Sequence, residues 1–379
     1  MANTLLTIDM ITREALRLAH EKATFIGTIN RQFDDSFGDA GAKIGDTLRI
    51  RYPSQYVRRQ GSLVMDVQDS VQISTALTVA TQDGVDMRFN SRELALDLDE
   101  FSQIHLEPAM ASLISNIDAD VIRGCSASTY NFAGTAGTAV SSLTAPGAGR
   151  TRLNQNLAPK DQNRRVQFDS GTMATIVSGV ASYFNPSNAI SEQYREGLIA
   201  RTAMADYYEN ERVFSLANTT SVTLSTAKMN GYISTAGQTS LNITSLTVSA
   251  VGVGMKYTLA NIFDVHPETK QPYAQLKQFT VLSTTNVSTF TFAPPVFLTG
   301  ARQNVAGIGT TTSTQALTWM GSPNSTYALG LMYHKDAYTF ATASLPLMGA
   351  SEKCVRRTYD GLSLRVWQDS DIRNDELLT

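Results

Sequence analysis

The stretch FSQIHLEPAMASLISNIDADVI, which runs from Phe101 to Ile122, decides how this chain of 379 residues is organised. Apolar side chains recur in it at every third or fourth position, which is the period of a helix that buries one face. These positions are Leu106, Met110, Leu113, Ile117 and Val121. The pattern predicts a long helix from about Asp99 to Arg123, in which Pro108 either starts a new helical segment or kinks the existing one.

Before this helix the apolar period shortens to two residues, which is typical of strands. The alternating apolar residues follow Asp46 and precede Phe89, and they are Leu48, Ile50, Tyr52, Val71, Ile73, Leu77 and Val79. Between the two sets lies RRQGSLVMD, which begins with Arg58 and Arg59. We predict a long two-stranded hairpin with these arginines and Gly61 at its tip. An isolated hairpin of two strands is marginally stable in water, so we expect it to lie against something else.

Two further helices are predicted. Near the N-terminus, Asp9 can cap a helix, and apolar residues follow it at helical spacing at Ile11, Ala15, Leu18 and Ala19. A later helix is predicted over Gln193 to Met204, because FNPSNAIS (Phe184 to Ser191) carries the Asn-Pro and Ser signals of a turn that leads into a helix.

The segment from about 218 to 320 is poor in charge and rich in Ser, Thr and Gly. Apolar residues alternate with Ser or Thr in it, as at Phe279, Val281, Phe290 and Phe292. The sequence HPETK, His266 to Lys270, supplies a turn between two such strands. We predict an inserted β-rich module, built as a small barrel or sandwich. Further on, Asp360-Gly361 in YDGLSLRV predicts a turn that feeds a strand.

Composition excludes several classes of protein. Lys and Arg number 31 against 34 Asp and Glu, and the formal net charge of −3 excludes a basic wrapper of nucleic acid. No stretch approaches the roughly 18 apolar residues that a membrane span needs. The opening MANTLLTIDM lacks the basic start and apolar core of a secretory signal. Cys125 and Cys354 are too few for a disulfide framework, which favours a reducing compartment.

A search for catalytic, cofactor and metal sites finds none. The histidines are scattered, with no HExxH and no carboxylates at metal-ligand spacing, at His20, His105, His266 and His334. No GxSxG motif exists, and Cys125 follows an apolar helix stripe, which favours a buried structural thiol over a nucleophile. APGAGRT, Ala145 to Thr151, lacks the lysine of a phosphate-binding loop and is interpreted as a mobile loop.

Several strings, taken in their order along the chain, carry a resemblance to a known family. The opening MANTLLTIDMITREALR and the helix FSQIHLEPAMASLISNIDADVI come first. FNPSNAISEQYREG (Phe184 to Gly197) follows, and HKDAYTFATASLPL and YDGLSLRVWQDSDI stand near the C-terminus. With the hairpin and the β-rich module, they resemble the major capsid proteins of tailed double-stranded DNA bacteriophages, which share the Hong Kong phage-type capsid fold. They are most similar to coat proteins of the short-tailed Salmonella phage group, which carry an insertion domain.

The resemblance implies an α+β fold with five parts. They are an N-terminal helical arm over 1–45, an extended hairpin loop over 46–90, a peripheral domain with a long spine helix over 91–130 and 345–379, an axial domain over 131–217 and 313–344, and an inserted all-β domain over 218–312.

The resemblance also implies a structural protein and no enzyme. Copies of the chain are expected to assemble as hexamers and pentamers into an icosahedral head that encloses double-stranded DNA and matures from a procapsid. Expected partners are other copies, a separate scaffolding protein, a portal protein and the packaged DNA, contacted non-specifically; a decoration protein is a further partner that the family allows. No cofactor and no membrane are expected. Assembly would take place in the host cytoplasm, and the chain would reside in the virion.

One alternative stays open, a self-associating phage tail-tube or baseplate protein, against which the long helices count.

Two sets of charged residues are candidate contacts between subunits. Arg58 and Arg59 are either simply solvated or a docking point for another subunit's carboxylates. Asp264, Glu268 and Lys270 lie either on an exposed turn without a partner or in reciprocal ion pairs across a two-fold axis.

Some members of the family weld their shells through a lysine of the hairpin loop. From Asp46 to Phe89 this chain has no lysine, and a guanidinium, which stays protonated, cannot replace the attacking amine. We therefore expect a shell held by noncovalent contacts alone.

Overall fold

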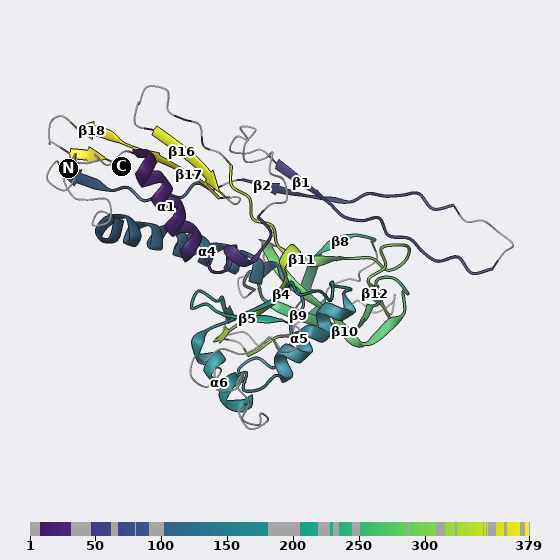
Figure 1. The fold of residues 1–379 in the computed structure, drawn as a ribbon. Coiled ribbons are helices and arrows are strands. Elements are labelled where there is room, and N and C mark those ends of the chain that lie inside the picture. The colour runs from purple at the N-terminus through teal and green to yellow at the C-terminus, as the bar shows by residue number, and fades with distance from the viewer. Residues whose placement is uncertain are drawn as a thin grey trace. The chain divides into compact units, whose positions relative to one another are not determined.

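The structure of the chain is a computed structural model, a mixed fold of helices and strands (Figure 1). It describes residues 8–31, 47–61, 67–79, 81–90, 102–180, 205–218, 228–229, 235–244, 251–286, 289–307, 315–322, 324–343, 345, 347, 354–359, 362–371 and 376–378. The chain divides into two compact units. Unit 1 comprises Met1–Tyr52, Ser74–Val121 and Lys335–Thr379, and unit 2 comprises Pro53–Ile73 and Ile122–His334.

The first helix of unit 1, α1, spans Ile8–Lys22 and buries the face that the sequence predicts. Ile11, Ala15, Leu18 and Ala19 are all buried and pack with apolar residues that include Leu106, Met110 and Ile114. Asp9 does not cap the helix, because the helix already begins at Ile8. Its carboxylate instead accepts hydrogen bonds from the Arg357 guanidinium, at 2.9 Å from Nε and 2.5 Å from Nη2, which lowers the pKa of Asp9.

The long helix α4 runs over Glu107–Ser128 after a π-helical turn at Ser102–Leu106. Pro108 is its second residue and thus lies in the first turn, where proline is tolerated, so it marks the start of the α-helical segment. The buried row follows the predicted one at Leu106 and Met110 and then departs from it, continuing through Ile114, Asp118, Ile122 and Ser126. The predicted Leu113, Ile117 and Val121 are half-buried beside this row.

Asp118 explains the shift of that row. Its side chain is fully buried, and its carboxylate accepts hydrogen bonds from the backbone N–H groups of Phe25, at 3.0 Å, and Ile26, at 2.9 Å. A buried carboxylate is tolerated when its oxygens are hydrogen-bonded. Asp118 thereby fixes the short 3₁₀ turn Ile26–Thr28 against α4.

The strands described in unit 1 form three small sheets. β1 (Thr47–Arg51) pairs antiparallel with β2 (Ser74–Thr78), with Leu48 opposite Leu77. β3 (Arg88–Asn90) pairs with β19 (Glu376–Leu378), which also pairs with β18 (Asp369–Asp371), so β3 belongs to a C-terminal sheet. β16 (Cys354–Tyr359) and β17 (Leu362–Trp367) form an antiparallel pair on either side of the predicted turn, and Leu364 packs with α1.

Unit 2 contains a three-stranded sheet with two helices. β4 (Arg164–Phe168) lies between β15 (Leu331–His334), antiparallel, and β5 (Asp206–Glu209), parallel. α6 (Ser170–Val180) follows Asp169, whose carboxylate accepts the N–H of Thr172 at 3.1 Å. α5 (Thr144–Gln155) contains the APGAGRT sequence, so the predicted mobile loop is wrong. The predicted helix over 193–204 and the FNPSNAIS segment lie outside the described residues.

The β-rich module of unit 2 is one seven-stranded sheet in the order β12-β9-β10-β11-β8-β7, with β13 also paired to β9. Its strands are β7 (Lys228–Met229), β8 (Gln238–Thr244), β9 (Lys256–Val265), β10 (Pro272–Asn286), β11 (Thr289–Val296), β12 (Val305–Ala306) and β13 (Leu317–Trp319). All of these strands share a single sheet, so the described residues do not form the two separate sheets of a sandwich.

The core of the module is aromatic and extends past the predicted limits. The Tyr257 ring lies 5.5 Å from Phe279, 5.6 Å from Phe290 and 5.2 Å from Trp319, centre to centre. Leu216 belongs to the same buried cluster; it comes from β6 (Ser215–Asn218), which pairs with β14 (Ser325–Ala328). A fragment cut at 218 and 312 would lose both Leu216 and Trp319. The buried cluster of the module therefore extends at least from Leu216 to Trp319.

Candidate interaction surfaces

The hairpin continues beyond β1 and β2 without backbone ladder pairs among residues 52–61 and 67–73. Side chains hold its two arms together instead. The Gln68 amide accepts the N–H of Val57 at 2.8 Å and donates to the Val57 carbonyl at 2.6 Å, which are the two bonds that a strand residue would exchange. Nearby, the Tyr56 hydroxyl donates to Ser70 Oγ at 3.1 Å. The arms thus stay paired while their backbone is not locked into a sheet.

The apolar side chains of this hairpin face solvent in the single chain. Their exposed fractions are 49% for Tyr52, 55% for Tyr56, 39% for Val57, 87% for Val67 and 62% for Val71. Burial of apolar surface is worth roughly 25 cal/mol per Å², so a folded chain gains by covering these side chains. An exposed set of this kind is typical of an interaction surface.

Arg58 and Arg59 follow Val57 on the same arm, and both are exposed. Gly61, with φ of 102°, turns the chain just after them through a conformation that favours glycine. The position of both arginines at the surface is compatible with the predicted contact to another subunit's carboxylates. That contact stays a prediction.

The turn that joins β9 to β10 is built around His266. Its backbone N–H donates to the Gln271 carbonyl at 2.9 Å, and its carbonyl accepts the Lys270 N–H at 3.0 Å. The ring nitrogen Nδ1 accepts two more backbone N–H groups, those of Glu268 and Thr269, each at 3.2 Å. Of the three predicted contact residues in this segment, Glu268 is exposed on this turn.

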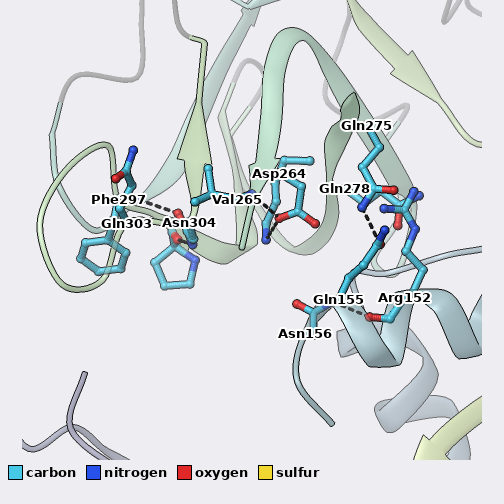
Figure 2. Close-up of polar contacts among 12 residues, drawn as sticks. Arg152, Gln155, Asn156, Asp264, Val265, Gln275, Gln278, Phe297, Gln303 and Asn304 are labelled. Atoms are coloured by element: carbon cyan, nitrogen blue, oxygen red, sulfur yellow. Dashed lines mark hydrogen bonds and ion pairs between the residues drawn. The ribbon is translucent and has the colours of Figure 1, made fainter. Parts of the chain in front are cut away.

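Lys270 joins this turn to the loop from Phe297 to Asn304, and the two together are called the module tip below. Its Nζ donates to the Ala301 carbonyl at 2.6 Å and lies 3.4 Å from that of Gln303. Asn304 closes the loop by accepting the Phe297 N–H at 2.9 Å, as Figure 2 shows. The Arg302 guanidinium stacks 3.9 Å from the centre of the Phe297 ring. Lys270 therefore already has partners inside the chain.

Asp264 lies inside the module and not on its surface. Its side chain is 5% exposed, as is that of Lys277, and their Oδ1 and Nζ atoms are 2.7 Å apart. The same Oδ1 accepts the N–H of Val265 at 3.1 Å (Figure 2). Buried charges require such partners. Asp264 thus has no surface to offer another subunit, and of its predicted set only Glu268 remains a candidate contact.

Strands β9 and β10 also supply polar side chains to the last turn of α4. Lys256 Nζ donates to the carbonyls of Ser126, at 3.0 Å, and Thr129, and Thr280 Oγ1 donates to that of Ala127 at 2.8 Å. The last carbonyls of a helix lack helical partners and carry a partial negative charge, so an ammonium suits them. Burial nevertheless lowers the pKa of Lys256 to about 8.

Gln278 extends this attachment past the helix. Its side chain accepts the Phe132 N–H at 2.9 Å and donates to the Phe132 carbonyl at 3.0 Å, and the adjacent Gln275 donates to Gln155 of α5 at 2.6 Å (Figure 2). Sequence reasoning missed Lys256, Gln278 and Lys277. The one available signal was that lysines are scarce in this charge-poor segment, which makes each of them notable.

Other ionisable groups do not assemble into a reactive site in the described part of the chain. His334 Nε2 lies 2.9 Å from Asp161 Oδ1, and no group of three metal-ligating side chains occurs among the described residues. Cys125 is half-buried, and burial raises the pKa of its thiol to about 12, in agreement with the predicted structural role. None of the helices described is long and apolar enough to cross a membrane.

Comparisons with known proteins give phage coat and capsid structures as neighbours. No protein-family model and no curated protein matches the chain. The "CUS-3 coat protein I-domain" is 19% identical with a TM-score of 0.21, and the match covers 25% of this chain and 95% of that one.

Two larger structures are also similar to the chain. "Mycobacterium phage Che8" is 11% identical with a TM-score of 0.39, covering 77% of this chain and 92% of that one. The "Capsid structure of the Cyanophage P-SCSP1u" is 10% identical with a TM-score of 0.33, covering 79% and 84%.

Proposed function

We propose that this chain is the structural major capsid protein of a tailed double-stranded DNA bacteriophage, which assembles as hexamers and pentamers into an icosahedral head. The observation that carries the proposal is the hairpin. Tyr52, Tyr56 and Val67 are exposed in the single chain, while Gln68 holds the two arms ready for a partner. The order of sequence strings that resembles coat proteins of this class supports the same conclusion.

The exposed hairpin and the near-neutral net charge both suit a subunit of a closed shell. Each subunit of a closed shell makes several different contacts with copies of itself, and heterologous contacts repeat around rings. An extended hairpin is suited to this, because it buries its apolar surface on a neighbour and not on its own core. The net charge of −3 suits a container, since a strongly basic wall would hold DNA by counterion release.

The module tip is proposed to strengthen contacts between neighbouring capsomers. It carries the exposed Glu268 on its turn and Arg302, stacked on Phe297, on its loop, and Lys270 ties the turn to the loop. A separate scaffolding protein, a portal protein, non-specifically bound DNA and a decoration protein belong to this proposal as partners. It also includes procapsid maturation, residence in the virion after assembly in the host cytoplasm, and the lack of any enzymatic activity.

Negative-stain electron microscopy of the purified chain, alone and after co-expression with its scaffolding protein, tests the proposal. We expect closed shells with the scaffold and aberrant or mixed-size particles without it. A self-associating tail-tube or baseplate protein, the second candidate, would also bury an exposed apolar hairpin. It would give tubes or flat assemblies, and either of these, or a chain that stays monomeric under both conditions, would overturn the proposal.

A further inference from the structure

We propose that the turn from His266 to Lys270 is a pH-gated element, ordered while the imidazole of His266 is neutral and loosened when the imidazole takes up a proton. The hydrogen bonds of the turn carry this inference. Only an unprotonated ring nitrogen accepts a hydrogen bond, and Nδ1 accepts two, from the N–H groups of Glu268 and Thr269 at 3.2 Å each. The ring hydrogen of the ordered turn must therefore sit on Nε2.

Protonation would turn this acceptor into a donor. The new Nδ1–H would point at two backbone N–H groups that carry the same partial charge, so the ring would have to rotate away and leave both without their acceptor. Histidine is the side chain whose charge ordinarily changes between pH 5 and 8.

The charged neighbours of the ring do not offset this loss. Tyr273 of β10 lies against the ring, with centres 6.0 Å apart. The carboxylate of Asp264, on β9, is held by Lys277, and Lys270 is held by the carbonyls of the 297–304 loop. Arg302 stacks on Phe297, and Glu268 is exposed on the turn itself. Among the described residues, no carboxylate lies within ion-pair distance of the His266 ring, so none would stabilise the protonated ring.

The consequence falls on Glu268, the exposed carboxylate of the module tip. Its own N–H is one of the two that lose their acceptor, whereas the Lys270 contact to Ala301 does not involve the ring. Acid would thus free the middle of the turn while the base of the tip stays attached. If the proposed function holds, on which this step rests, contacts made between subunits through Glu268 would weaken when the ring is protonated.

Hydrogen–deuterium exchange of the full chain, read on a peptide that covers 264–271 and corrected for intrinsic rates, tests the gate. Between pH 7.5 and pH 5.5, we expect protection of this peptide to fall about tenfold, the loss expected from two hydrogen bonds of ordinary strength. His266→Asn keeps an oxygen acceptor in place of Nδ1 and does not titrate, so its protection should not change with pH. His266→Ala, with no acceptor, should lack the protection of the Glu268 and Thr269 amides at both values, while the amides of His266 and Lys270 keep theirs.

A peptide from the middle of β10 serves as the internal reference, since its ladder bonds do not depend on the ring. Equal protection of the wild-type turn at both pH values would overturn the gate, and so would a His266→Asn variant that loses protection in parallel with the wild type. This result is independent of particle formation. If shells form but protection of the turn does not change with pH, only the pH gate is refuted. If protection changes with pH but no shells form, only the proposed function is refuted.

Discussion

The hairpin and the β-rich module are both built from alternating apolar residues, and they use them in opposite ways. In the module, Tyr257, Phe279 and Phe292 are fully buried against one another. In the hairpin, Tyr56 and Val67 are more than half exposed, and the arms are held by side-chain hydrogen bonds. An alternating pattern therefore predicts a strand but does not say what covers its apolar face. One region covers itself, and the other is left for a second molecule.

The largest effect expected is on the stability of the module. Phe279→Ala should lower the free energy of unfolding by about 3–5 kcal/mol, because it removes a fully buried ring and leaves a cavity beside Tyr257. Tyr56→Ala, the matched change in the hairpin, should cost no more than about 0.5 kcal/mol. Urea unfolding of both variants measures this, and similar losses at the two sites would erase the contrast between the regions.

The next effect concerns assembly. Changing both Arg58 and Arg59 to Glu should block or distort shell formation while the isolated chain stays folded, because both side chains are exposed. A charge-assisted contact desolvated in an interface is worth about 2 kcal/mol or more on truncation. Electron microscopy scores the shells and circular dichroism the fold. Lys160→Glu, also a reversed charge at an exposed site, is the control, and normal heads from the double variant would refute the contact.

A smaller effect is expected where β9 meets the end of α4. Lys256→Met leaves the carbonyls of Ser126 and Thr129 without their donor, which costs about 1–3 kcal/mol, although it also removes a buried charge. Thermal or urea unfolding at pH 7.5 compares it with Lys160→Met, an exposed lysine whose loss should be neutral. If the two variants are equally stable, the bonds from Lys256 to the carbonyls of Ser126 and Thr129 do not stabilise the end of α4.

The pH dependence of that variant has a definite sign. The pKa of Lys256 is lowered to about 8 in the folded chain, so above that value the unfolded chain binds more protons and stability rises with pH. This gain is complete near the ordinary lysine value of about 10.4, and Lys256→Met lacks it. The stability gap between wild type and variant should therefore widen by about 1–2 kcal/mol from pH 7.5 to 9.5. A gap that narrows over this range would contradict the burial of the ammonium.

The smallest effect is local to the hairpin arms. Gln68→Ala removes both bonds to the Val57 backbone, a loss of about 1 kcal/mol that should not reach the global unfolding transition. Amide exchange of Val57 should become faster, and shells should form more slowly because the arms are no longer held together. Gln60→Ala, a change of the same kind at an exposed site nearby, is the control. Unchanged exchange at Val57 would show that Gln68 does not hold the arms.

The sequence predicted an element well where its packing follows from local spacing, and poorly where it depends on residues distant in the sequence. The buried face of α1 followed from spacing alone, because Ile11, Ala15 and Leu18 recur with the period of a helix. On α4 the same reasoning missed part of the buried row, because it did not expect a buried Asp118. The cost of burying this carboxylate is offset by hydrogen bonds from the backbone N–H groups of Phe25 and Ile26, which are distant in the sequence.

Composition misled in two other places. The two glycines of APGAGRT suggested a loop, yet the segment is part of α5. The charges of the 264–270 turn suggested surface contacts, but Lys277, which pairs with Asp264, sits on the neighbouring strand, and strand register is not visible in the sequence. Arg58 and Arg59 are exposed, and their contact with another subunit stays a prediction.

The measurement that tests the central claim most directly is oxidative footprinting of tyrosine in the isolated chain and in assembled particles. Tyr56 is 55% exposed in the single chain and should react several-fold more slowly once a second copy covers the hairpin, whereas the buried Tyr257 should react slowly in both forms. Tyr359, which is 62% exposed and lies outside the hairpin, is the reference for the reactivity of an exposed tyrosine in the isolated chain. Equal reactivity of Tyr56 before and after assembly would contradict the account, because the hairpin would then remain uncovered in the particle.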